Sequence, residues 1–162
     1  MQFSVCSFSS KKTNNMKDIP LAEITLRKYE KPSNLEKREL VRKICLSLGL
    51  LQLGDSRDII VDILMVLIEA NKTKEKLTSD EIGKKVEELR KNYSLDMKGL
   101  AESNIRRQLK RLRDYMIVDK TENKYYLSEH SSLKEIFIGS IEKFVIPQII
   151  ERIKEYLHEL DK

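Results

Sequence analysis

The chain has 162 residues, enough for one domain or for a small domain with helical extensions. Hydrophobic residues make up 40% and can form a core, while five Gly, three Pro and no Trp favour a mostly helical chain. Lys and Arg number 31 against 26 Asp and Glu, so the net charge is only +5, and a basic patch has to be judged by where its charge lies.

Several kinds of site are not expected. Cys6 and Cys45 are the only cysteines, and His130 and His158 are isolated, so local spacing yields neither a disulfide framework nor a zinc cluster. No nucleophile–base pair or glycine-rich phosphate loop is recognisable, and catalysis needs such convergent groups. We therefore predict neither an enzyme nor a cofactor. Cys45 falls within an apolar stripe, and we interpret it as a small buried hydrophobic residue.

The apolar run from Ile59 to Ile68 is interrupted by Asp62 and is far shorter than a membrane span. The first residues lack the basic start and apolar middle of a signal peptide. We expect a cytoplasmic protein with no membrane partner.

The N-terminal part divides into a tail or arm, residues 1–32, and a helix with its connector, residues 33–55. Residues 24–29 alternate apolar and polar side chains, which predicts a short strand or an extended arm. Ser33 and Glu36 have the spacing of a capping box, and Gly49 follows the apolar stripe as a natural helix stop.

The next segment, about 57–70, is apolar on most sides and is expected to be a helix at the centre of the core, capped by Asp55 or Ser56. Its polar strip is thin and consists of Asp58, Asp62 and Glu69. A shorter helix is predicted from Thr78 to near Asn92, followed by a loop over 93–99.

Residues 100–115 form the most informative segment. Ile105, Leu109, Leu112 and Met116 recur at helical spacing, which predicts a helix held down by one apolar face. Five cations occupy its other faces, and short polar residues stand at its leading end. These residues are Ser103, Asn104, Arg106, Arg107, Lys110, Arg111 and Arg113. Such a helix suits the major groove of DNA, although a solvated basic face on an ordinary core helix would read the same way.

Two β-prone runs follow, residues 116–120 and 124–128, with Thr121-Glu122-Asn123 as a three-residue turn. Lys120 and Lys124 then lie at the tip of a hairpin. For Tyr125 and Tyr126 we expect one ring in the core and one half-exposed.

Residues 131–162 are predicted to form a long C-terminal helix that begins at a capping box, Ser132 to Glu135, and that Pro147 should kink or divide. The helix either spans the domain as a core element or joins two copies, and we favour a homodimer because so long an unpaired apolar stripe is unusual. The residues expected to form the dimer contact are Phe137, Ile141, Phe144, Ile149, Ile153 and Leu157.

The order of buried helix, short helix, loop, basic helix and hairpin over about 56–130 resembles winged helix-turn-helix proteins, particularly small archaeal and bacterial transcriptional regulators. The resemblance rests on 103–112, 117–120 and 124–127, and departs from the family at Tyr115-Met116, where a Gly is usual, and in its longer loop. It implies a mainly α fold with a small β-hairpin wing, flanked by the N-terminal helix and the long C-terminal helix.

The resemblance nominates Ser103, Asn104, Arg106, Arg107, Lys110 and Arg111 for DNA, and Lys120 and Lys124 for phosphate. The function that we expect is regulation of transcription by a homodimer that binds double-stranded DNA. The alternative is a winged module that docks on other proteins of a transcription or replication complex.

Overall fold

The computed structural model describes residues 19–54 and 58–162. Its elements in chain order are α1 (Lys37–Ser47), α2 (Ile59–Asn71), β1 (Leu77–Thr78), α3 (Ser79–Asn92), α4 (Glu102–Asp114), β2 (Val118–Thr121), β3 (Lys124–Leu127), a 3₁₀ turn (Ser128–His130), α5 (Leu133–Ile136), a π-helical segment (Phe137–Val145) and α6 (Ile146–Leu160). The protein is thus mainly helical with a small antiparallel sheet, as the sequence predicted.

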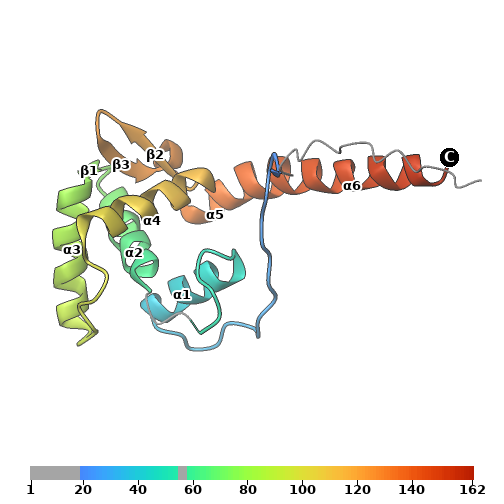
Figure 1. Ribbon diagram of the computed structural model, residues 1–162. Coiled ribbons are helices and arrows are strands. Elements are labelled where there is room, and N and C mark those ends of the chain that lie inside the picture. Colours follow the sequence, from blue (N-terminus) through green and yellow to red (C-terminus); the bar gives the residue numbers. More distant parts are fainter. Residues whose placement is uncertain (1–18, 55–57) are drawn as a thin grey trace, which may run out of the picture.

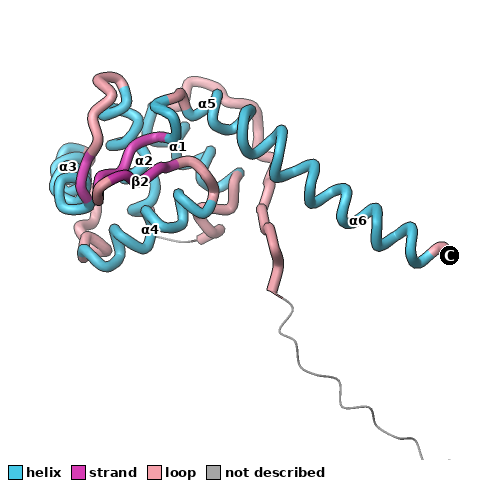
Figure 2. The backbone as a smooth tube through the Cα atoms, turned by 90° about the horizontal axis from the view of Figure 1, so that it is seen from above, coloured by secondary structure: helices cyan, strands magenta, loops and turns pink. Residues whose placement is uncertain are grey.

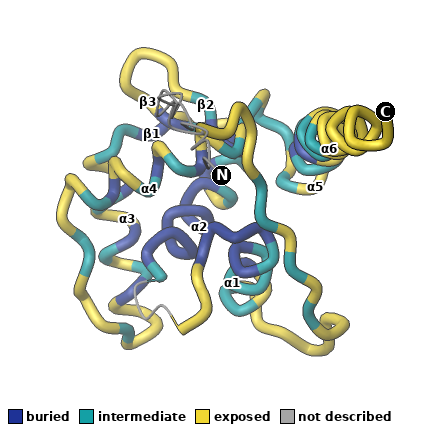
Figure 3. The backbone as a smooth tube through the Cα atoms, turned by 45° about the vertical axis from the view of Figure 1, so that its right-hand side comes forward, coloured by how far each residue is buried: buried dark blue, intermediate teal, exposed yellow. Residues whose placement is uncertain are grey.

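Helix α2 lies at the centre of the molecule, and α1, α3, α4 and strand β3 all pack against it (Figure 3). Ten of its side chains are buried, including every residue from Ile59 to Leu67. The prediction of a central core helix is confirmed, although Asp55 and Ser56, its predicted caps, lie outside the described residues. The structure has Asp58 at the cap position, without a side-chain capping bond.

The sheet has the order β1-β3-β2, and both pairings are antiparallel. Its first strand was not predicted, because two residues are too few to show an alternating pattern. The prediction of a three-residue hairpin turn was wrong. Thr121 pairs with Lys124, which leaves Glu122 and Asn123 as a two-residue turn. Both turn residues have positive φ, as a type I′ turn requires.

Residues 24–29 form an extended arm without a strand, and the backbone amide of Arg27 donates to the carbonyl of Ser47. The capping box predicted at Ser33 and Glu36 is wrong. Asn34 has φ of 49° and Glu36 is extended, so the helix begins only at Lys37, without a side-chain cap.

Glycine and methionine end α1 and α4 in the same way. Gly49 and Met116 have φ of +67° and +57°, and in each case the residue's own amide and the next amide donate back into the last helical turn. The chain thus leaves α4 through a left-handed Met116. Cys45, near the end of α1, is fully buried, as predicted.

The C-terminal helix starts at the predicted capping box of Ser132 and Glu135 and then extends away from the other helices (Figures 1 and 2). The helix continues past Pro147, but it is divided into two segments there, as the sequence allowed: the π-helical segment ends at Val145 and α6 begins at Ile146. None of the described helices is long and apolar enough to cross a membrane.

Replacing Gly49 by Ala should destabilise the fold by about 1–3 kcal/mol, since a non-glycine residue is strained at this φ. The added Cβ would also lie 2.5 Å from Thr25 Cβ. Urea unfolding measures the effect. Gly83→Ala in α3 is the matched control: its Cβ meets open space, and it should stabilise by about 0.5–1 kcal/mol. Equal effects of the two substitutions would contradict this account of Gly49.

Candidate nucleic-acid interface

Helix α4 is held against the core by the apolar face that its spacing predicts. Ile105, Leu109 and Leu112 are at most 1% exposed, and all three belong to the main hydrophobic cluster. The fourth predicted member, Met116, lies beyond the helix end and is 40% exposed. With one face fixed in this way, exposed side chains can come only from the other faces of the helix.

Four of the residues nominated on α4 are exposed: Ser103, Arg106, Arg107 and Lys110. The Arg106 guanidinium forms an ion pair with the Glu102 carboxylate at 2.5 Å, and its Nε donates to Ser79 Oγ at 3.5 Å. Arg107 donates to Asn104 Oδ1 at 2.7 Å. Lys110 and the neighbouring exposed Arg113 form no ion pair within the described part of the chain.

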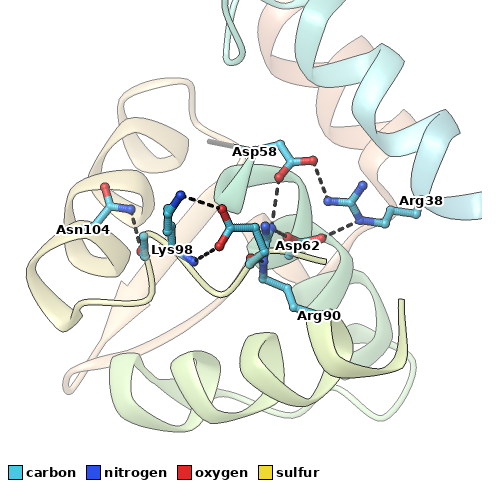
Figure 4. A network of polar contacts seen from close by, with 8 residues as sticks. Arg38, Asp58, Asp62, Arg90, Lys98 and Asn104 are labelled. Atoms are coloured by element: carbon cyan, nitrogen blue, oxygen red, sulfur yellow. Dashed lines mark hydrogen bonds and ion pairs between the residues drawn. The ribbon is translucent and has the colours of Figure 1, made fainter. Parts of the chain in front are cut away.

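Asn104 and Arg111 are placed differently from the other nominated residues, since both are half-buried. The Asn104 amide donates to the carbonyl of Gly99 at 2.7 Å and so closes the loop in front of α4 (Figure 4). Arg111 donates to Gln108 at 3.2 Å and approaches the carbonyl of Gly49 at 3.5 Å. Both side chains are therefore used within the fold rather than presented at its surface.

The hairpin brings more cations to the same side of the molecule. Lys120 and Lys124 are exposed, and the ammonium of Lys120 lies 5.4 Å from the centre of the Tyr125 ring. Tyr125 is buried and Tyr126 half-buried, as expected. Lys110, Arg113 and Lys120 line one hollow of about 580 Å³ between α4 and the hairpin, together with Asp114 and Asp119.

Acidic residues lie at both ends of α4. A second hollow, of about 610 Å³, is lined by Arg106 and Lys120 but also by Asp80 and Glu102. Each hollow thus contains two acids, and within the described residues Arg106 is paired with Glu102, whereas Arg107, Lys110 and Arg113 form no ion pair.

A network of four charges, two buried and two half-buried, connects α1, α2 and α3 (Figure 4). Arg38 of α1 donates to Asp58 at 2.6 Å and to Asp62 at 2.8 Å. Arg90 of α3 donates to Asp58 at 3.0 Å and also to Asp62. Asp62 is 0% and Arg90 3% exposed, so these charges are compensated by one another rather than by water.

The network extends to the loop that leads into α4. Arg90 Nε donates to the carbonyl of Asp96 at 2.7 Å, and the carboxylate of Asp96 accepts from the Lys98 amide at 3.0 Å.

The sequence predicted Asp58 and Asp62 only as part of a polar strip and did not predict the network. Two acids four residues apart on an otherwise apolar helix could have signalled buried partners, because a buried charge is rarely left unpaired.

The residues predicted for dimerisation divide into two groups. Ile141 is only 1% exposed and belongs to the core of this chain, so its assignment to a dimer contact is wrong. Phe137 is half-buried against the same core, and Ile149 is also half-buried. Phe144, Ile153 and Leu157 are more than half exposed and remain available for a contact.

The described residues contain no group of three or more His, Cys, Asp or Glu side chains placed to hold a metal ion. Burial raises the pKa of the Cys45 thiol to about 12, which keeps it protonated at neutral pH.

No protein-family model matches the sequence, and neither the curated proteins nor the solved structures compared with it gave a match.

Arg90→Met should destabilise the protein by about 3–5 kcal/mol, because it leaves the buried Asp62 with only Arg38 as its partner. Lys91→Met is the control on the same helix, where an exposed pair with Glu87 is lost and about 0–1 kcal/mol is expected. Urea denaturation compares the two variants. A similar small loss for both would show that the network contributes little.

Acid should weaken the network through Asp58. Burial acts to raise the pKa of this carboxyl, but the hydrogen bonds from Arg38 and Arg90 outweigh it, so the pKa lies below its ordinary value. The stabilisation is therefore complete above the unfolded pKa of about 4 and is lost as the pH falls through the lower folded pKa. Asp58→Asn should flatten the fall of the unfolding free energy below about pH 4. The exposed Glu88→Gln should leave its slope nearly unchanged, and parallel curves for all three proteins would refute the assignment.

Proposed function

We propose that this protein is a transcriptional regulator of the winged helix-turn-helix type that binds double-stranded DNA as a homodimer. Helix α4 would enter the major groove, and the β2–β3 hairpin would contact the phosphate backbone beside it. One observation carries the proposal: α4 buries three apolar residues while it exposes Arg107, Lys110 and Arg113, and Lys110 and Arg113 line one hollow with Lys120 of the hairpin.

The arrangement of the elements supports the same proposal. A buried helix (α2), a shorter helix (α3), a loop, a basic helix (α4) and a hairpin follow one another, and α3 and α4 pack both on α2 and on each other. This is the order on which the resemblance to winged helix-turn-helix proteins rests. A fold of this type also occurs in protein-docking modules, so the proposal depends on the charges of α4 rather than on the fold alone.

The chemistry of the exposed side chains suits a DNA duplex. The major groove is about 12 Å wide and admits a helix, and Arg can contact guanine with two hydrogen bonds. Ser103 and Arg107 are exposed and can approach base edges, whereas Asn104 is turned toward Gly99. Lys110, Arg113, Lys120 and Lys124 would neutralise phosphates.

A homodimer would place two copies of α4 on one duplex. Two-fold symmetry then implies a pseudo-palindromic site whose half-sites are separated by about one helical turn or a multiple of it. Both copies would contribute phosphate contacts, so the dependence on salt should be steep.

Binding to a random-sequence duplex, measured by fluorescence anisotropy over a series of salt concentrations, tests the proposal. We expect affinity to fall steeply with salt. In Arg107→Ala/Lys110→Ala the slope of log K against log salt should be shallower by about 2 for each bound copy, as two phosphate contacts are lost. Its melting temperature should not fall, since both side chains are exposed.

Lys28→Ala/Lys31→Ala is the matched control, because it removes the same charge from exposed positions in the arm. This variant should keep the wild-type slope. Equal weakening by both double substitutions would indicate attraction by net charge alone. No binding even at low salt would refute the proposal and favour the alternative, in which α4 meets an acidic surface of a partner protein.

A further inference from the structure

Arg107 lies at the centre of the face of α4 that points away from the core. At about 100° per residue, its direction on the helix is nearly opposite to that of the three buried apolar residues. The exposed Ser103 precedes it by one turn on this face, and the exposed Lys110 follows it by one turn. A helix that enters a groove with this face forward brings Arg107 closest to the base edges.

The guanidinium of Arg107 is held by an amide and not by a carboxylate. Its Nη2 donates to Asn104 Oδ1 at 2.7 Å, and among the described residues it forms no ion pair. The neighbouring Arg106 is instead paired with Glu102 at 2.5 Å, and Lys110 has neither an ion pair nor a positioning contact in the same part of the chain. Arg107 therefore combines an uncompensated charge with a defined direction.

The Asn104 amide is itself fixed by the loop in front of α4 (Figure 4). Its Nδ2 donates to the carbonyl of Gly99 at 2.7 Å, and its Oδ1 also accepts from Gln108 Nε2 at 3.3 Å. A flipped amide would place Oδ1 against the Gly99 carbonyl and Nδ2 against two donors, so only one orientation satisfies all these bonds. Gly99 packs closely on the core, since an added Cβ would lie 3.0 Å from Ile59 Cγ1 of α2. The direction of Arg107 is thus determined by contacts that reach the centre of the molecule.

The donors that Arg107 keeps free match one base better than the others. A guanidinium has five N–H groups and no acceptor, and the contact with Asn104 uses one of them. In the major groove guanine presents two neighbouring acceptors, N7 and O6. Adenine presents an acceptor beside a donor, cytosine presents a donor, and thymine presents one acceptor beside a methyl group. A group that only donates can form two hydrogen bonds with guanine and at most one with any other base.

We infer that Asn104 is a positioning residue that orients Arg107 to bind a guanine in the major groove. The inference rests on the proposed function, because it requires that α4 enters the groove, and it adds the base that is recognised. A side chain that is oriented before binding loses less conformational freedom when its hydrogen bonds to the base form. Asn104 then contributes to recognition through Arg107 and not through its own contact with DNA.

Selection of bound duplexes from a pool with a randomised centre tests the inference, followed by affinity measurements on single-base variants of the selected duplex. We expect the wild-type protein to prefer guanine over adenine at one position of each half-site by about 5- to 150-fold. At that position 7-deazaguanine, which lacks the N7 acceptor, should remove most of the preference. Inosine keeps N7 and O6 and should retain it. Arg107→Ala should abolish the preference.

The role of Asn104 is tested on the same duplexes. Asn104→Ala should reduce the guanine preference by about 3- to 10-fold, because Arg107 then has to be ordered on binding. Its affinity for a random duplex and the salt slope should stay unchanged, since the removed amide is neutral. In the Arg107→Ala background the same substitution should have no effect on the preference, which a merely structural role would not produce.

Gln108→Ala is the matched control, because it also removes a half-buried amide from α4 but no contact with Arg107. This variant should keep the wild-type preference. Asn104→Leu, which is similar in size to Asn, replaces Asn104→Ala if the latter lowers the melting temperature.

Two results would overturn the inference while leaving the proposed function intact. Steep salt-dependent binding without a preferred guanine would mean that Arg107 contacts only phosphates. An unchanged preference in Asn104→Ala and Asn104→Leu would mean that Arg107 needs no positioning. The absence of binding to any duplex at low salt is a different outcome, because it refutes the proposed function and the inference together.

Discussion

The compensation of two acids, at the start of α2 and within it, is the constraint on which the arrangement of the helices depends. Asp62 is buried in this highly apolar helix, where an unpaired carboxylate would cost several kcal/mol, and Asp58 is the half-buried residue at its cap position. Arg38 and Arg90 reach them from α1 and α3, and each guanidinium contacts both acids. Apolar packing allows many similar arrangements of helices, whereas these hydrogen bonds are satisfied in few of them. The network thus specifies how α1 and α3 lie on α2.

The position of α4 follows from the same contacts. Arg90 also holds the carbonyl of Asp96, so the loop that leads into α4 starts from a fixed point, and Asn104 closes that loop onto Gly99. Three buried apolar residues then determine which side of α4 faces outward. The exposed cations are carried by a rigid element, and a preorganised surface loses less conformational entropy on binding than a mobile one. The proposed activity at the surface would therefore depend on ion pairs in the interior.

The extent to which the sequence predicted the structure differs between local and long-range features. The apolar faces of α2, α3 and α4, and the capping box at Ser132, depend on neighbours within a few residues, and all of them formed. Ser33 and Glu36 have the same spacing but did not cap α1, because the backbone between them is not helical. Partners distant in the sequence were missed, as with β1 on β3 and the arginines on Asp62. Within the candidate interface, periodicity predicted which side of α4 is exposed, but the inward turn of Asn104 and Arg111 depends on Gly99 and Gly49.

The most direct test of the account is to map a bound duplex onto the protein by nuclear magnetic resonance. The amide signals of ¹⁵N-labelled protein would be followed during titration with a short random-sequence duplex at low salt. The account predicts that the largest shifts occur in α4 from Ser103 to Arg113 and in the hairpin around Lys120 and Lys124, while the arm and the solvent face of α3 change little. Shifts concentrated on the arm, on α1 or on α6, or no shifts at all, would contradict it.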